Sequence, residues 1–178
     1  MNPVELVKKD GTFRLLVNGK PMLLLGGQIR NSSSSSVESI NSCFAKASAL
    51  NYNFVISPVS WKQFEAEEGK FDYTLLAHQI QVAEKHSLKL VLIWFGAFKN
   101  AKSSYAPKWV RSDLKRFPRA LNQKNGQPSN SPTLSVFSQN LLDADKAAFE
   151  HMLRDYIKSA GIELIVLARY MQILSPEF

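Results

Sequence analysis

Residues 88–110, LKLVLIWFGAFKNAKSSYAPKWV, decide the fold of this chain. The run 90–93 is short, apolar and unbroken, which is typical of a strand buried on both faces of a parallel sheet. Aromatic and polar residues follow it: Trp94, Phe95, Phe98, Lys99, Asn100, Tyr105 and Trp109. In α/β folds, ligands bind in the loops at the carboxyl ends of strands. Aromatic faces beside Lys and Asn donors suit a sugar, so we expect this stretch to contact carbohydrate.

Strands, loops and helices alternate along the rest of the chain. Strands are predicted at 53–59 and 88–94, and a helix at 73–86 has Asp72 as its N-cap. A second helix starts at Asp143 or Asp145 and ends at Gly161, and the apolar run 162–168 predicts a fourth parallel strand. This alternation favours an α/β fold of about three and a half βα units. A closed barrel of eight units needs about 250 residues, so this chain is too short to form one.

The N-terminal region predicts a hairpin. Its strands are 12–17 and 20–25, joined by Asn18-Gly19, the commonest hairpin turn signal. The serine run 32–36 is interpreted as a strand-to-helix loop, with a flexible linker as the alternative. A long loop is expected from Gly96 to about Leu141.

Composition limits the functional class. The chain has 178 residues, enough for one domain, with 45% apolar and 21% charged residues. Its net charge of +7 is scattered and no zinc-finger spacing accompanies it, so we expect no nucleic-acid partner. No apolar stretch is long enough to span a membrane, and no secretory signal is visible, which leaves the cytoplasm as the default expectation. The single cysteine, Cys43, excludes an internal disulfide.

Titratable residues form no obvious catalytic or metal-binding set. The densest carboxylates are Glu65, Glu67, Glu68 and Asp72, which we interpret as a solvated loop. The three histidines, 78, 86 and 151, lack ligand spacing with one another and with Cys43. No nucleophile elbow or phosphate-binding glycine motif occurs, so neither a metal nor a cofactor is expected.

Three segments carry a resemblance to a known family: LLLGGQIRNSSSSS (23–36), PVSWKQFEAEEGKFDY (58–73) and LVLIWFGAFKNAKSSYAPKWV (90–110). RFPRA (116–120) and ADKAAF (144–149) follow in the same order. Over about residues 10–158 the chain resembles the β-galactosidase-like glycoside hydrolases of families 35 and 42. The resemblance implies a partial (β/α)₈ (TIM) barrel, the N-terminal part of the family's barrel, and a β-galactoside as substrate.

The resemblance also implies where the catalytic carboxylates of the family would lie. These enzymes are retaining glycosidases with two carboxylates about 5 Å apart. The acid/base Glu is expected in an Asn-Glu pair at the end of the fourth strand, and the nucleophile far beyond residue 178. Here the fourth strand reads IELIVLARYMQ, without that pair. We therefore predict no catalytic residue in this chain and expect it to be inactive alone.

Residues expected to contact the sugar follow the first three barrel strands. They are Gln28, Arg30, Asn31, Trp61, Trp94, Lys99 and Asn100. For the first three, hydrogen bonding within the loop is the alternative. For Trp61 the alternative is packing under its loop. Tyr105 and Trp109 are predicted to anchor the long loop.

The tail matches a different family. IELIVLARYMQILSPEF (162–178) resembles a segment of formyltetrahydrofolate deformylase, so we expect a division into 1–160 and 161–178 with a junction near Ala160. A gene fusion, a frame error and a deliberate chimera all fit. Three functions stay open: a truncated or chimeric glycoside hydrolase, a non-catalytic carbohydrate-binding or assembly fragment that self-associates through open sheet edges, and a deformylase remnant.

Overall fold

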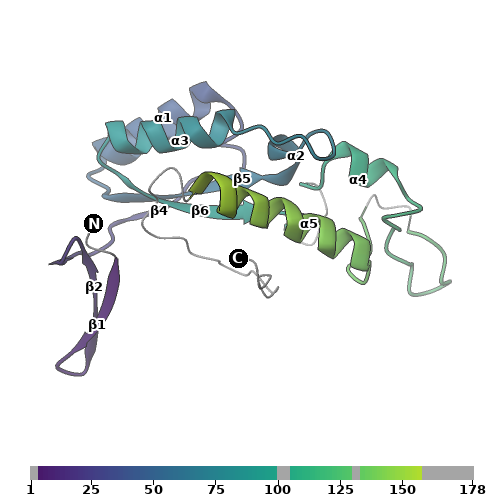
Figure 1. Ribbon diagram of the computed structural model, residues 1–178, viewed down its shortest axis with the longest axis horizontal. Helices are drawn as coiled ribbons and strands as arrows, with labels where there is room; N and C mark the ends of the chain where they lie inside the picture. The colour runs from purple at the N-terminus through teal and green to yellow at the C-terminus, as the bar shows by residue number, and fades with distance from the viewer. Residues whose placement is uncertain (1–3, 100–104, 130–132, 158–178) are drawn as a thin grey trace.

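The computed structural model describes residues 4–99, 105–129 and 133–157, which form two three-stranded sheets and their helices (Figure 1). The predicted fourth strand at 162–168, the junction near Ala160 and the tail lie outside the described residues. The site residue Asn100 lies outside them as well.

The N-terminal sheet is antiparallel and consists of β1 (Glu5–Lys9), β2 (Thr12–Val17) and β3 (Lys20–Pro21). Asn18 and Gly19 have φ of 53° and 72°, as a type I′ turn requires, which confirms the predicted hairpin. Asp10-Gly11 makes the same kind of turn, with φ of 51° and 77°, and adds the unpredicted strand β1. The predicted strand 20–25 is shorter than expected, and Leu23 and Leu25 are largely exposed.

The second sheet is parallel, in the order β4 (Gly26–Gln28), β5 (Phe54–Ser60) and β6 (Lys89–Phe95). The predicted strands at 53–59 and 88–94 are confirmed within one residue. β4 lies so close to β5 that a Cβ on Gly26 would be 2.0 Å from the Phe54 carbonyl oxygen. Only glycine fits there, so Gly26 sets where the first parallel strand begins.

Helices α1 (Val37–Ala49) and α3 (Thr74–Lys85) pack together and cover one face of this sheet. Phe44 from α1 and Val82 from α3 meet Val55 of β5 in a buried cluster. The Ser36 hydroxyl caps α1 by accepting from the Ser39 amide, which confirms the serine run as a strand-to-helix loop. Asp72 accepts from the Thr74 amide as predicted, although the N-cap residue itself is Tyr73.

The region after β6 is more ordered than the predicted loop 96–141. It contains α4 (Lys108–Ser112), and α5 (Gln139–His151) begins at the N-cap Ser138 rather than at Asp143 or Asp145. A π-helix, η1 (Met152–Ile157), continues α5. Phe149 of α5 packs with Leu92 and Val59, so α5 covers the same face of the sheet as α3.

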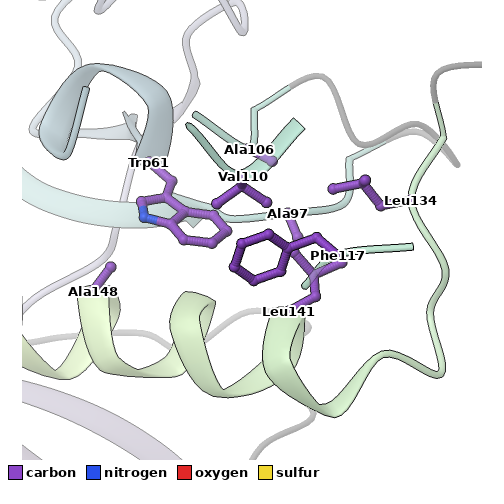
Figure 2. Close-up of a cluster of buried hydrophobic side chains, with 8 residues drawn as sticks. All are labelled: Trp61, Ala97, Ala106, Val110, Phe117, Leu134, Leu141 and Ala148. Carbon is purple, nitrogen blue, oxygen red and sulfur yellow. The ribbon is translucent and has the colours of Figure 1, made fainter. Parts of the chain in front are cut away.

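A second buried cluster lies beyond the strand ends, where α2 (Trp61–Phe64), α4 and α5 meet (Figure 2). Its members are Trp61, Ala97, Ala106, Val110, Phe117, Leu134, Leu141 and Ala148. It joins the loops after β5 and β6 to α5, so it fixes the backbone from which candidate site residues project.

The described residues contain three βα units and a three-stranded parallel sheet, and within them no closed barrel is seen. This is a mixed α/β fold, as expected. Among the described helices, none is long and apolar enough to cross a membrane.

Candidate functional site

The candidate site lies at the carboxyl edge, defined as the ends of β4, β5 and β6 at Gln28, Ser60 and Phe95 and the loops that follow them. The three strands are parallel, so these ends lie at one edge of the sheet. Every predicted sugar-contacting residue that the structure describes lies at one of these strand ends or in the segment that follows it.

The first strand end presents polar side chains. Gln28 is exposed and lies next to Ile56 in register, on the face of the sheet opposite α1 and α3, because Val55 faces those helices. Arg30 is also exposed, and Asn31 is half-buried. The Arg30 carbonyl accepts from the Ser33 amide at 2.9 Å, which fixes the turn. The Gln28 and Arg30 side chains are therefore available to a ligand.

The second strand end buries its tryptophan. Trp61 has 0% exposure and donates from Nε1 to Glu65 Oε2 at 2.7 Å. Its ring lies edge-on to Trp109, with centroids 5.9 Å apart. The sequence allowed two roles for Trp61, contact with a sugar or packing under its loop. The structure shows the packing, because the fully buried ring has no face open to a sugar.

Glu65 corrects the solvated-loop interpretation of the acidic segment. It is 6% exposed, and besides Trp61 it accepts from the Gly69 amide at 2.8 Å through Oε1. The neighbouring carboxylates are exposed and paired, Glu67 with Lys70 and Glu68 with Arg116. The hydrogen bond from Arg116 lowers the pKa of Glu68. The acidic segment is therefore a structural connection, with Glu65 as its buried anchor.

The third strand end repeats the tryptophan–carboxylate arrangement. Trp94 is half-buried and faces the helices, 5.8 Å from the Phe149 ring. Its Nε1 donates to Asp145 Oδ1 at 2.7 Å, and the Ala97 amide donates to Oδ2 at 2.8 Å. A Cβ on Gly96 would lie 2.2 Å from Asp145, so glycine is required for this approach. Asp145 of α5 thus holds the start of the loop that carries Lys99.

Asp145 was predicted only as a possible start of a helix, and its role in holding this loop was missed. Burial raises the pKa of its carboxyl above the usual value, while the hydrogen bonds from Ala97 and Trp94 lower it. Both oxygens accept hydrogen bonds, so this carboxylate holds the loop.

An aromatic–lysine cluster, consisting of Lys62, Phe95, Lys99 and Tyr105, links the second and third loops. The Lys99 Nζ lies 4.5 Å from the Phe95 ring centroid, and the Lys62 Nζ lies 5.1 Å from that of Tyr105. The two rings are 4.9 Å apart, and the Lys62 amide donates to the Tyr105 carbonyl at 2.9 Å. Tyr105 therefore anchors its loop, as predicted. Lys62 was missed, although its place directly after Trp61 was the available signal.

A small cavity of mixed polar and apolar lining lies behind the second strand end, between β5 and α3. Ser34, Ser60, Gln63 and Gln79 are among its lining residues, and about 20 Å³ is open to the centre of a water molecule. The Ser57 hydroxyl donates to Gln79. Among the described residues the Ser60 hydroxyl is buried without a hydrogen-bond partner. The cavity holds a water molecule at most and is too small for a sugar.

The carboxyl edge presents groups that can form hydrogen bonds to a ligand: two ammonium groups, a guanidinium and a primary amide, beside the half-buried Tyr105 ring. In the part of the chain that is described, no three potential ligand residues group to hold a metal ion. The buried carboxylate Glu65 and the half-buried carboxylate Asp145 each accept hydrogen bonds from an indole and a backbone amide.

Solved structures show what this fold resembles. An exo-beta-1,4-mannosidase, Op5Man5 from Opitutaceae bacterium strain TAV5, matches 92% of this chain with a TM-score of 0.62 and 17% sequence identity. A polyextremophilic beta-galactosidase from the Antarctic haloarchaeon Halorubrum lacusprofundi matches 75% with a TM-score of 0.55 and 17% identity. The fold is therefore glycosidase-like.

The matches cover only a part of those enzymes. The chain spans 28% of the mannosidase and 19% of the beta-galactosidase. No family model matches the sequence, and no curated protein matches it.

Proposed function

We propose that this chain is a truncated or chimeric part of a β-galactosidase-like (β/α)₈ barrel that binds a β-galactoside-like carbohydrate at the carboxyl edge and does not hydrolyse it. The three parallel βα units would be the first three of the barrel. In this proposal the ligand contacts Gln28, Arg30 and the aromatic–lysine cluster, with Asn31 and Asn100 as further contacts predicted from the sequence. Trp94 faces the helices and supports the loop through Asp145.

The observation that carries the proposal is the aromatic–lysine cluster at the end of two parallel strands. A sugar ring has apolar C–H faces and a rim of hydroxyls, so it needs both aromatic contact and hydrogen-bond donors. Lys62 and Lys99 supply charged donors, and the half-buried Tyr105 ring supplies the aromatic contact. Phe95, with 1% exposure, supports Lys99 and Tyr105 from below and offers no open face of its own. Gln28 and Arg30 supply further polar groups from the neighbouring strand end.

The absence of hydrolysis is proposed from the carboxylates. Retaining glycosidases need two carboxyl groups about 5 Å apart, facing the glycosidic bond. In the described residues, the carboxylates packed against the loops of the carboxyl edge are Glu65, which is buried, and Asp145, which is half-buried, and each accepts two hydrogen bonds. In this proposal Glu65 and Asp145 fix the loops and take no part in acid/base chemistry.

Binding and turnover test the two halves of this proposal separately. We expect the purified full chain to bind methyl β-galactoside and to leave an aryl β-galactoside intact. Lys99→Ala should weaken binding about tenfold, the effect of losing one charged hydrogen-bond donor. The control Lys85→Ala, on α3, should not change it. Undetectable binding would refute the recognition half, and turnover lost in Trp94→Ala would refute the inactivity half.

Assembly is a second candidate, favoured by exposed apolar residues. Leu23 and Leu25 are 73% and 54% exposed between the two sheets. Surfaces of this kind often mark an interface. The deformylase alternative rests on residues 162–178, outside the described residues, and remains a prediction that binding of a folate analogue would test.

A further inference from the structure

Strand β1 has a free edge. It pairs with β2 on one side, and among the described residues no strand pairs with its other side. All five of its residues are exposed. Figure 1 shows the hairpin projecting away from the helices and the parallel sheet. An exposed edge of this kind presents unpaired N–H and C=O groups to another strand.

The hydrogen-bond pattern identifies which residues of β1 face outward. The Leu15 carbonyl accepts from the Met22 amide at 2.9 Å, so the backbone groups of Leu15 point toward β3. Leu6 lies opposite Leu15 in the register of β1 and β2, so this pair exchanges no hydrogen bonds. The backbone groups of Leu6, and by alternation those of Lys8, therefore point to the free edge.

We propose that β1 pairs antiparallel with β1 of a second copy of this chain, about a two-fold axis through Val7. Leu6 of each copy then lies opposite Lys8 of the other, and these two outward-facing residues exchange backbone hydrogen bonds. Glu5 of each copy lies opposite Lys9 of the other. The strand ELVKK is therefore self-complementary in charge in this register.

Neighbouring registers are less favourable. An axis through Lys8 would place the two Lys8 side chains directly opposite each other, which is destabilising. An axis through Leu6 would place Glu5 opposite Val7 and leave the Glu5 charge unpaired. The charge pattern therefore favours the register whose two-fold axis passes through Val7. Because β1 complements itself in that register, the partner strand at the free edge is β1 of a second copy.

The pairing also covers apolar surface. Leu6 and Phe13 are 67% and 66% exposed and share one face of the hairpin, because Leu6 pairs with Leu15 and Phe13 with Lys8. Joining two hairpins along β1 makes one continuous sheet and brings two copies of this face side by side. The hairpin precedes β4 and contributes no residue to the carboxyl edge, so this inference does not depend on the proposed function.

The first experiment measures the mass of the full chain by sedimentation equilibrium over a concentration series. We expect a reversible dimer. Lys8→Pro removes an outward N–H, and proline is tolerated there because β1 is an edge strand. Lys8→Pro should abolish the dimer, whereas the matched control Lys8→Ala, which keeps the N–H, should retain it. Unchanged amide NMR shifts in β2 would show that the hairpin is intact.

The second experiment reverses charges. Glu5→Lys places two lysines opposite each other at both ends of the pairing and should raise the dimer dissociation constant about tenfold. The double variant with Glu5→Lys and Lys9→Glu should restore it. A wild-type chain that is monomeric at every concentration would overturn the proposal. A dimer that survives both Lys8→Pro and Glu5→Lys would overturn it as well, by assigning association to another surface.

Discussion

The carboxylate of Asp145 organises the end of β6, and replacing it by the isosteric Asn tests this role. In Asp145→Asn one oxygen can still accept a hydrogen bond, but the amide NH₂ faces either the Trp94 indole N–H or the Ala97 N–H. One hydrogen bond to a charged acceptor is lost, at about 1.5–3 kcal/mol. Relief of the burial cost of the carboxylate offsets part of this. The expected net loss in free energy of unfolding is about 1–2 kcal/mol.

Urea unfolding at pH 7, followed by tryptophan fluorescence, measures this difference. The matched control is Asp143→Asn on the same helix, where the carboxylate is exposed and accepts from the Gln139 side chain. That control should stay within about 0.5 kcal/mol of the wild type. If Asp145→Asn unfolds at the same urea concentration as Asp143→Asn, or at a higher one, the assigned role of Asp145 is wrong.

Three further substitutions probe packing by the same urea assay. Gly96→Ala should lower the free energy of unfolding by about 2 kcal/mol, because its Cβ would lie 2.2 Å from Asp145. The control Gly27→Ala, whose Cβ would enter open space, should lower it by less than about 1 kcal/mol. Equal losses would contradict the close approach of Gly96 to Asp145. Phe44→Ala, at a site with 0% exposure, should cost about 3–5 kcal/mol, and a loss below about 1 kcal/mol would contradict its place in the core. Ser60→Ala should leave stability unchanged or raise it by about 1 kcal/mol, because its hydroxyl is buried without a partner among the described residues; a clear loss would show that a water molecule bridges it.

The parts of the fold that could be predicted are those set by local sequence. The apolar run 90–93 placed β6 within one residue, and Asn18-Gly19 placed the turn between β2 and β3. The Asp10-Gly11 turn carried the same signal but was missed, because ELVKK before it has no apolar alternation that predicts a strand. The start of α5 was also misplaced, because Asp and Ser are equally good N-caps and Asp143 and Asp145 lie nearer than Ser138 to the apolar face at Phe149.

The candidate site was less predictable because its geometry depends on distant residues. The direction of the Trp94 indole is set by Asp145, 51 residues later in the chain. The setting of Trp61 depends on Glu65, four residues on, which was predicted to be solvated. The sequence shows a tryptophan near the end of each of two strands. The carboxylates that accept hydrogen bonds from their indole N–H groups are known only from the folded structure. Lys99 and Gln28 could be placed at the carboxyl edge from their positions in the sequence, whereas Lys62 was missed.

The central claim, that the carboxyl edge binds carbohydrate, is tested most directly by an NMR titration of the ¹⁵N-labelled full chain with methyl β-galactoside. The account predicts saturable shifts confined to the amides of the carboxyl edge, at Gln28–Arg30, Lys62, Ala97–Lys99 and Tyr105. Shifts confined to the hairpin or to α1, or no shifts at saturating sugar, would contradict it.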